Sequence, residues 1–426
     1  MRHIWILIIF VALLPVTPAQ IGTDHVFVYV DINAPGPGTG TETDPFVTIA
    51  AAMAYVIPHD YVFVRPGVYQ EVVDLPYFIF LRSTDGADVT TIDATGLPGT
   101  HAVTIGTLGE VTGFTIKKDD GAGLLAQSTG PFEFGRVIRR NRVLDCPNGG
   151  IHMSGPIHPI MDVNVVAGCG NFGIRSENGA SPYMSCNTVT ECTIGLEGVG
   201  APPDAQAFFA NSIFWGNTTD VSGFAPAGLI SCDVGDGTFV GVNNSFNADP
   251  MWRNPVARDY RLVPGSPCID ATDPFYVLSS TEFDNRGYGA WRKMDGDFDG
   301  NVDADVGALE YGGFESWQSG TGVGSVLNLE VETGPGTAWF LAYGPYNLVP
   351  EIPLPIAGSS HFLLWIDSQQ LTLLANGTQP ASGMTTLSFA ITSPALVGLR
   401  LPAQALGVDW TGPTYHFTHA NVVSVQ

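Results

Sequence analysis

Three ionisable side chains occupy the same place in three similar tetrapeptides, GIHM, GIRS and GLEG, which begin at residues 150, 173 and 195. They are His152, Arg175 and Glu197. Side chains alternate between the two faces of a strand, so these three point outward if the preceding Ile or Leu points inward. Glu177, two residues after Arg175, then faces the same way. Such a face can bind a ligand or transfer protons, or form solvated ion pairs worth about 0–1 kcal/mol.

A second charged segment, Lys117-Lys118-Asp119-Asp120, precedes these tetrapeptides where a loop lengthens the spacing. It belongs to a group of bases between residues 117 and 175, namely Lys117, Lys118, Arg136, Arg139, Arg140, Arg142 and Arg175. A local group of bases can attract an anionic ligand even when the whole protein is negative. We therefore include Lys118, Asp119, Asp120, Arg142 and Glu177 among the candidate ligand-binding residues.

A third candidate is an acidic stretch in which oxygen-bearing side chains alternate along residues 295–305. It contains Asp295, Asp297, Asp299, Asn301, Asp303 and Asp305, with glycines at 296 and 300. Oxygen ligands at alternate positions followed by glycine are typical of calcium loops, but an EF-hand needs Glu where this chain has Val306. Two interpretations stay open, an irregular Ca²⁺ site that includes Asp295, Asp297, Asp299 and Asp303, or a solvated acidic loop.

The six cysteines follow two patterns. Cys146, Cys169 and Cys192 are each separated by 23 residues, and stacked neighbours at about 4.8 Å exceed the preferred Cβ separation of a disulfide. We expect these three to be buried free thiols. If a disulfide forms, the pair we expect is Cys232 with Cys268.

The 23-residue spacing is a repeat. Asn141, Asn164 and Asn187 have the same separations, as do Val143, Val166 and Val189. A fourth copy begins at Asn211 with one extra residue. Neither a helix nor a hairpin produces this period, whereas a solenoid of stacked coils does, with about nine coils at ~4.8 Å each. Stacked asparagines can then pass amide hydrogen bonds from coil to coil.

The composition agrees with a chain of short strands and turns. Among 426 residues there are 51 glycines and 31 prolines, which disfavours a helical bundle. The net charge of −24 argues against nucleic-acid binding, because phosphate backbones repel such a surface. A hydrophobic fraction of 45% excludes general disorder.

The amino-terminal sequence predicts export. Arg2 and His3 precede the apolar run 4–14, and small residues at 17 and 19 suit cleavage, so residues 1–19 are predicted to be a signal peptide. The apolar run is too short to span a membrane, and no later segment approaches 20 apolar residues. We expect a secreted or cell-surface protein.

The repeat, with its asparagine–x–aliphatic pattern followed by Gly-Ile, resembles the right-handed parallel β-helix of the pectin-lyase-like class. The segment 29–71 resembles the entry motif of secreted bacterial members, with a capping helix within 45–56. ADPMWRNPVARDYRLVPGSPCIDATD at 248–273 resembles their closing segment, and 295–313 their acidic tail. The resemblance covers about 26–313. It implies that an outward face of one sheet holds any catalytic residues, here His152, Arg175, Glu197 and Lys117, although no complete lyase signature is present.

The chain changes character after Gly313. Residues 314–324 are polar and glycine-rich and predict a linker. Seven strand-like runs within 325–426 then predict a small antiparallel β-sandwich. This part resembles a carboxy-terminal domain of exported bacterial proteins, especially of planctomycete-like lineages. Attachment to a surface or glycan binding is one interpretation, and a solubilising cap is the other.

Two hypotheses for function follow from the sequence and the resemblance. In the first, an extracellular β-helix protein binds a polysaccharide or cell-surface glycan, or acts as a spacer, without catalysis. In the second, the protein is a polysaccharide lyase or glycoside hydrolase that acts on an acidic polysaccharide, with Ca²⁺ as the cofactor we would expect.

The calcium hypothesis has a direct consequence for thermal stability. If Ca²⁺ bridges the carboxylates of residues 295–303, EDTA is expected to lower the melting temperature, because a ligand that binds only the folded state stabilises it. Differential scanning calorimetry with EDTA, and with EDTA plus excess Ca²⁺ as the control, measures this. An unchanged melting curve would exclude a stabilising calcium site.

Overall fold

The structure is a computed structural model. It describes residues 27–128, 134–200, 208–225, 228–277, 284–285, 303–319, 323–332, 336–343, 372–380, 382, 384–394, 400–409 and 414–424. The predicted signal peptide and the calcium candidates Asp295, Asp297 and Asp299 lie outside these residues. Within the described part, no helix is long and apolar enough to cross a membrane.

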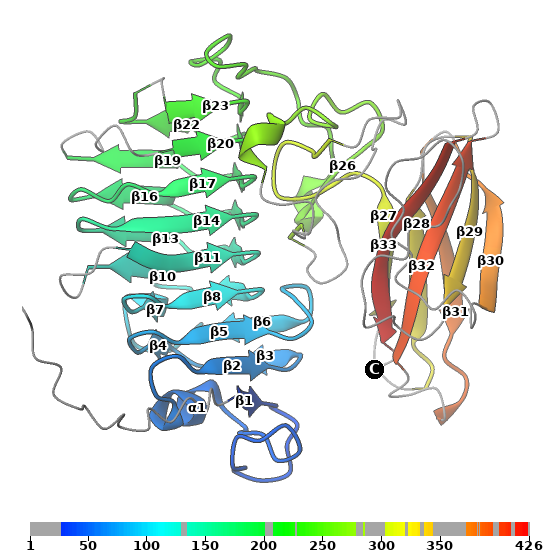
Figure 1. Ribbon diagram of the computed structural model, residues 1–426, viewed down its shortest axis with the longest axis horizontal. Coiled ribbons are helices and arrows are strands. Elements are labelled where there is room, and N and C mark those ends of the chain that lie inside the picture. Colours follow the sequence, from blue (N-terminus) through cyan, green and yellow to red (C-terminus); the bar gives the residue numbers. More distant parts are fainter. Residues whose placement is uncertain are drawn as a thin grey trace, which may run out of the picture.

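Three parallel sheets form the larger part of the molecule (Figure 1). Sheet 1 contains β1 (Phe27–Val30), β2 (Tyr61–Val64), β5 (Phe80–Ser83), β8 (Glu110–Thr112), β11 (Phe134–Arg139), β14 (His158–Asp162), β17 (Tyr183–Ser185), β20 (Phe208–Ala210) and β23 (Leu229–Ile230). Sheet 2 contains β4 (Val73–Leu75), β7 (His101–Ile105), β10 (Ala122–Gln127), β13 (Gly149–Ser154), β16 (Phe172–Glu177), β19 (Ile194–Val199) and β22 (Thr219–Ser222). Sheet 3 contains β3 (Gly67–Tyr69), β6 (Thr90–Asp93), β9 (Thr115–Lys117), β12 (Arg142–Leu144), β15 (Val165–Ala167), β18 (Thr188–Thr190), β21 (Ile213–Trp215) and β24 (Asp233–Val234).

The chain passes from sheet 1 to sheet 3 to sheet 2 in every turn, and each strand pairs in parallel with strands of the turns above and below. This arrangement is the predicted parallel β-helix. It has about seven complete turns rather than nine. The difference arises because the early turns are longer, as in the pairing of Phe80 with Glu110, and because the chain after Val234 folds outside the helix.

Apolar side chains fill the interior in rows that run along the whole helix. The row of sheet 1 is buried from end to end and consists of Val28, Val62, Leu81, Val111, Ile138, Met161, Met184, Phe209 and Leu229. Each such side chain contributes about 1.5–3 kcal/mol when it leaves water. The strands are only two to six residues long, so stacking between turns holds this fold together.

The asparagine repeat forms a buried ladder at the corner between sheet 1 and sheet 3. Nδ2 of Asn141 donates to Oδ1 of Asn164 at 3.2 Å, and Nδ2 of Asn164 donates to Oδ1 of Asn187 at 3.0 Å. The same oxygens accept backbone N–H groups from the preceding turn. The ladder continues to Ser212, whose hydroxyl accepts from the Asn187 N–H at 3.1 Å. The expected fourth member, Asn211, therefore lies one residue out of register.

Each turn also brings glycine, valine and cysteine together at a second corner. A Cβ on Gly150 would collide with Cγ1 of Val166 and lie 3.3 Å from Sγ of Cys169, both in the next turn. Gly173 meets Val189 and Cys192 in the same way. The glycines are therefore required because they face the interior. Cys146, Cys169 and Cys192 are buried free thiols, as expected.

The expected disulfide between Cys232 and Cys268 is not formed, and both residues are buried free thiols. Cys232 points into the interior, where its Sγ contacts the carbonyls of Phe209 and Ile230. Asp233, the next residue of the same chain segment, points to the opposite side and accepts the Cys268 Sγ–H at 3.5 Å. The two thiols thus lie on opposite faces of sheet 3, so sequence spacing alone could not show that they are separated.

One helix lies at the amino-terminal end of the solenoid. It is α1 (Ile49–Tyr55), within the expected range 45–56, and Thr48 caps it by accepting the Ala51 N–H. Glu71 accepts the Ile49 and Ala50 N–H groups with its two carboxylate oxygens. Ile49 and Ala52 pack into the end of the interior, which keeps water from the first coil.

The closing segment packs on the outer face of sheet 3. It contains the hairpin β25 (Trp252–Asn254) and β26 (Asp259–Leu262), and the 3₁₀ turns η2 (Pro255–Ala257) and η3 (Pro274–Tyr276). Residues 303–311 join it, and Ala308 donates its N–H to Thr188 Oγ1 at 2.9 Å. Asp305 and Glu310 are fully buried there. This part of the acidic tail is therefore interior and not solvated. Its buried carboxylates are satisfied by the backbone N–H groups that they accept.

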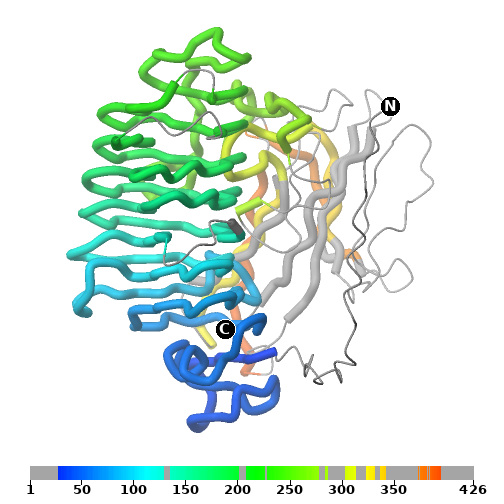
Figure 2. The backbone as a smooth tube through the Cα atoms, turned by 60° about the vertical axis from the view of Figure 1, so that its left-hand side comes forward, coloured from blue at the N-terminus to red at the C-terminus, as the bar shows by residue number. Residues whose placement is uncertain are grey.

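The coils stacked in Figure 2 are followed by two antiparallel sheets, which pack on each other through one apolar core as a small sandwich. One contains β27 (Gly313–Ser319), β28 (Val326–Glu332) and β31 (Met384–Ala390), and the other β30 (Thr372–Thr378), β29 (Ala338–Tyr343), β32 (Arg400–Asp409) and β33 (Thr414–Ser424). Their shared core includes Leu329, Val331, Trp339 and Leu341. The predicted linker 314–324 is instead strand β27 over most of its length, because it pairs along all of β28.

A buried carboxylate joins the sandwich to the solenoid. Glu330 of β28 is fully buried and accepts hydrogen bonds from Arg253 of β25 and from Arg261 of β26, the latter at 2.8 Å. Asp259 completes the cluster. Burial raises the pKa of Asp259, but its hydrogen bond to Arg261 and the charges of Arg261 and Arg253 hold that pKa below the ordinary value. The two parts therefore dock through desolvated charge pairs.

We expect Asn164→Ala to destabilise the solenoid strongly. The substitution removes the acceptor of two groups on Asn141 and the donor to the Ile138 carbonyl, all buried, and such unsatisfied groups cost about 1–3 kcal/mol each. Urea unfolding should therefore show a loss of about 2–4 kcal/mol. The matched control is Asn178→Ala, which removes an exposed amide bonded to Ser154 and Glu177. Equal stability losses in the two variants would contradict a structural role for the ladder.

Candidate functional site

The outward residues identified from the three tetrapeptides form one row across sheet 2. Leu125, His152, Arg175 and Glu197 are partners in consecutive strands from β10 to β19. The residues just before them, Leu124, Ile151, Ile174 and Leu196, are fully buried in the interior. The strand alternation expected from the sequence is therefore present, and Glu177 lies one position further along the same face, beside Ser154.

Arg175 is held in place from two sides. Its Nε donates to Oε2 of Glu197 at 2.6 Å, and its guanidinium carbon lies 4.0 Å from the ring centroid of Phe172. The Arg175 side chain is 28% exposed and that of Glu197 17% exposed. Because the hydrogen bond uses Nε, a ligand carboxylate can be bound through the terminal nitrogens of the same guanidinium. The aromatic ring and the carboxylate fix the orientation of the cation before a ligand arrives.

Phe172 also positions His152. The two rings meet edge to face with centroids 5.9 Å apart, and Nε2 of His152 lies 3.0 Å from Oε1 of Glu177. The Phe172 ring lies over Gly149, where a Cβ would overlap the ring. Gly149 has a positive φ of 147°, which L side chains rarely adopt. The turn that begins β13 therefore has the glycine that this ring requires.

A second histidine lies beside the row, whose own position on β7 is Thr104. His101 begins β7, and its ring centroid is 6.1 Å from that of His152. Burial, followed by the charge of His152, lowers the pKa of His101, and Asp74 acts in the opposite direction. Its neutral form is thus favoured at neutral pH, in which one ring nitrogen accepts a proton or a hydrogen bond. The sequence reasoning missed His101, because it lies outside the 23-residue repeat.

The sequence reasoning also missed Phe172, because the inward–outward alternation of side chains breaks at this corner of the coil. Simple alternation would place it inward with Ile174. Gly173 and Ile174 both face the interior instead, so the alternation breaks and Phe172 faces the row. The signal available in the sequence was the glycine at 149 that makes room for its ring.

The segment 117–120 does not join this row. Lys117 lies on β9 of sheet 3, paired with Asp93. Lys118 is only 1% exposed, and its Nζ donates to the Ala94 and Leu97 carbonyls and pairs with Asp120. Its proposed role in ligand binding was therefore wrong, because the ammonium is used to satisfy buried carbonyls. Asp119 is exposed and accepts the Gly96 N–H at 2.9 Å, which lowers its pKa.

Arg136, Arg139 and Arg142 make structural contacts on the other two sheets. Arg142 lies on sheet 3, where it bonds to Asn285 at 2.6 Å and pairs with Asp88. Arg136 is fully buried and donates to Thr107 and Gln127, and burial lowers its pKa. Proximity in sequence therefore did not produce a basic surface. On sheet 2 the cation of the row is Arg175, and it lies among carboxylates.

The acidic calcium candidate is described only in part. Asp303 begins the segment that packs on sheet 3, whereas Asp295, Asp297 and Asp299 fall outside the described residues. Among the residues that the structure describes, no group of three or more His, Cys, Asp or Glu side chains could hold a metal ion. The calcium site stays a prediction.

Comparison with known proteins finds solved structures that align with part of this chain. No model of a known sequence family matches the chain, and no curated protein matches it. The pectate lyase Pel9A aligns over 67% of this chain and 96% of its own, with 13% identity and a TM-score of 0.30. A rhamnogalacturonan lyase aligns over 53% and 63%, with 12% identity and a TM-score of 0.27. A pectin methylesterase, solved in complex with a hexasaccharide, aligns over 52% and 80%, with 13% identity and a TM-score of 0.25. Similarity at this level transfers no residue role to this chain.

Proposed function

We propose that this protein is an exported β-helix protein that binds an acidic polysaccharide along the outer face of sheet 2. The observation that carries the proposal is the fixed guanidinium of Arg175, which Glu197 and Phe172 orient on a half-buried surface. A charge-assisted contact to a sugar carboxylate is strongest when the cation is already oriented and partly desolvated. The signal-peptide-like residues 1–19 support export.

The row can match a linear polymer. Successive strands of a parallel sheet are about 4.8 Å apart, so His152, Arg175 and Glu197 present polar groups at regular steps along the helix axis, and His101 adds an imidazole beside His152. The imidazoles and the carboxylates can exchange hydrogen bonds with hydroxyl groups, while Arg175 takes the carboxylate. This mixed pattern favours a polymer that has both kinds of group, rather than a densely charged one, because Glu177 and Glu197 repel additional negative charge. Ca²⁺ at residues 295–303 belongs to the same proposal as a stabilising ion.

We expect Arg175→Ala to weaken polysaccharide binding about 10–100-fold, because it removes a charge-assisted contact worth about 1.5–3 kcal/mol. Affinity electrophoresis of the mature protein in gels that contain partly methyl-esterified pectin, with polygalacturonate and alginate as more densely charged comparisons, measures the retardation. Arg65→Ala is the matched control, since Arg65 is a similarly exposed arginine paired with Asp31 at the other end of the solenoid. Wild-type protein that migrates without retardation, or an Arg175→Ala variant that is retarded as strongly as wild type, would refute binding at this face.

A second candidate function is β-elimination on a uronate, and the lowered pKa of His101 favours it. Arg175 would stabilise negative charge on the sugar carboxylate while a neutral imidazole of the row removes the proton on the adjacent carbon. The electrons left on that carbon then form a double bond, the glycosidic C–O bond breaks, and the departing oxygen takes a proton from the imidazolium or from water.

Turnover would therefore create unsaturated chain ends that absorb near 235 nm. We expect that His101→Ala and His152→Ala would each lower such a rate about 10²–10⁴-fold if that imidazole is the base. The His158→Ala variant is the control, because His158 lies on sheet 1. Absence of any absorbance increase with pectate, alginate and glycosaminoglycans would leave the binding function and exclude the lyase.

A further inference from the structure

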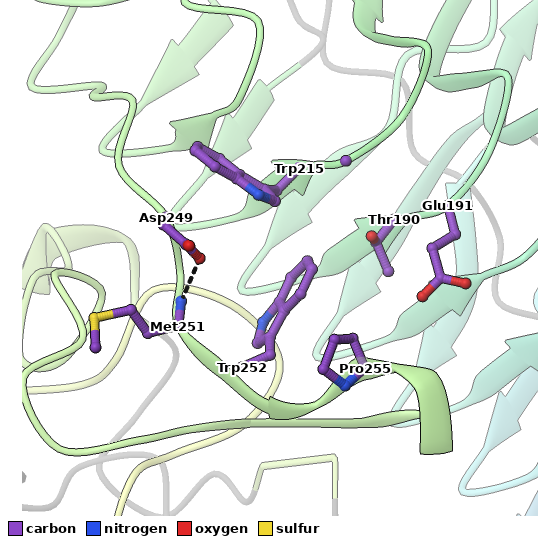
Figure 3. Close-up of a pocket in the computed structure, with 8 residues that line it drawn as sticks. Thr190, Glu191, Trp215, Asp249, Met251, Trp252 and Pro255 are labelled. Carbon is purple, nitrogen blue, oxygen red and sulfur yellow. Dashed lines mark hydrogen bonds between the residues drawn. The ribbon is translucent and has the colours of Figure 1, made fainter.

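A pocket of about 400 Å³ lies on the outer side of sheet 3, away from the row on sheet 2 (Figure 3). Its walls come from three segments that are distant in sequence. The end of β18 and the residue after it provide Thr190 and Glu191, and the end of β21 provides Trp215. The closing segment provides Asp249, Met251 and Trp252. None of these residues was singled out by the sequence reasoning.

Two indole rings dominate the pocket, and both are fixed from behind. Trp215 packs against the backbone of Gly235, where a Cβ would lie 2.9 Å from the Trp215 ring. Trp252 meets the ring of Tyr260 edge to face, with centroids 5.2 Å apart and planes at 76°. Rings that are immobile before binding lose little conformational entropy when a ligand packs against them. Both tryptophans are nevertheless partly exposed at the pocket.

Carboxylates lie on either side of the Trp252 ring, as Figure 3 shows. Oε1 of Glu191 accepts the Tyr260 hydroxyl at 3.0 Å, and Oε2 pairs with Arg258. Asp249 accepts the Met251 N–H with Oδ1 at 2.8 Å. These contacts orient both carboxylates. Arg258 pairs with Asp145 as well as with Glu191, so it compensates the charge of Glu191 only in part, and the pocket offers oriented hydrogen-bond acceptors that keep negative charge.

We propose that this pocket binds a neutral sugar residue of an oligosaccharide or polysaccharide, as a second carbohydrate site on the molecule. A pyranose ring presents C–H groups on its faces and hydroxyl groups around its edge. The indoles match the faces, and the carboxylates with Thr190 match the edge. The volume lies within the ~300–1,000 Å³ of small-ligand pockets. The proposal does not rest on the sheet 2 face, because it uses other residues on another sheet.

The charge of the pocket selects among sugars. Glu191 and Asp249 would repel the carboxylate of a uronate, whereas they accept hydrogen bonds from neutral hydroxyl groups. A quaternary ammonium ion is the main competing ligand, because tryptophan and negative charge also attract cations. Such ions are held best by rings that surround them. In this pocket two rings form one part of the wall, and Thr190, Glu191, Gly216, Asp249, Met251 and Pro255 form the rest.

The experiment is a titration of the mature full-length protein, followed by isothermal calorimetry and tryptophan fluorescence. The probes are neutral tetrasaccharides of glucose, mannose, galactose and xylose, together with galacturonate and tetramethylammonium. We expect saturable binding of at least one neutral tetrasaccharide. We expect Trp215→Ala to weaken it about ten-fold or more, and Asp249→Ala to weaken it several-fold.

Controls separate loss of the site from loss of folding. Asp249 is exposed, so Asp249→Ala should keep the wild-type melting temperature even if Trp215→Ala does not. Trp339→Phe changes an indole buried in the sandwich core and should leave sugar binding unchanged.

Three results would overturn the proposal. They are the absence of binding by every neutral sugar, neutral-sugar binding that survives both pocket substitutions, and preferential binding of tetramethylammonium or galacturonate that these substitutions abolish. Because the sheet 2 face is tested with anionic polymers and Arg175→Ala, either proposal can fail without the other.

Discussion

The in-register stacking of successive coils is the constraint on which the rest of this structure depends. The buried amides of Asn141, Asn164 and Asn187 fix it, since each side chain bonds to a neighbouring amide of the ladder and to the backbone of the preceding turn. A coil that slipped by one residue would turn its interior side chains outward and break these bonds. Consequently every residue of a coil has a defined neighbour in the next, and the 23-residue period of the sequence becomes a set of straight rows in space.

Those rows explain why polar side chains can gather on sheet 2 without a dedicated loop. His152, Arg175 and Glu197 are adjacent because their coils are in register, and Phe172 then links two of them through ring contacts. The same regularity limits the interior. Gly150 and Gly173 leave room for a valine and a cysteine of the next coil, so these cysteines fit inside the solenoid as buried free thiols. One periodic pattern thus serves packing on one side of each strand and presents functional groups on the other.

The role of a charged residue in this protein depends on whether it is buried, and its position in the sequence does not show that. Lys118 and Arg136 lie inside and satisfy carbonyl and hydroxyl groups, although both belong to a segment that is rich in bases. Asp305 and Glu310 are buried in the segment that packs on the outer face of sheet 3. Glu330 joins the sandwich to the solenoid through two arginines. Desolvated charges of this kind are costly to leave unpaired. Each of them therefore fixes the position of a segment that short strands alone would hold weakly.

The sequence by itself determined the solenoid, its coil length, the inward and outward faces of sheet 2, and the position of α1, because these depend on periodicity and on local alternation of side chains. It also indicated the buried thiols at 146, 169 and 192. Only the tertiary structure decided that Cys232 and Cys268 lie on opposite faces of a sheet, that 314–319 continues a strand, and that His101 and Phe172 belong beside Arg175. It alone brought Trp215 and Trp252 to one pocket. These features depend on contacts between segments whose separation in the chain follows no period, and a local pattern carries no information about such contacts.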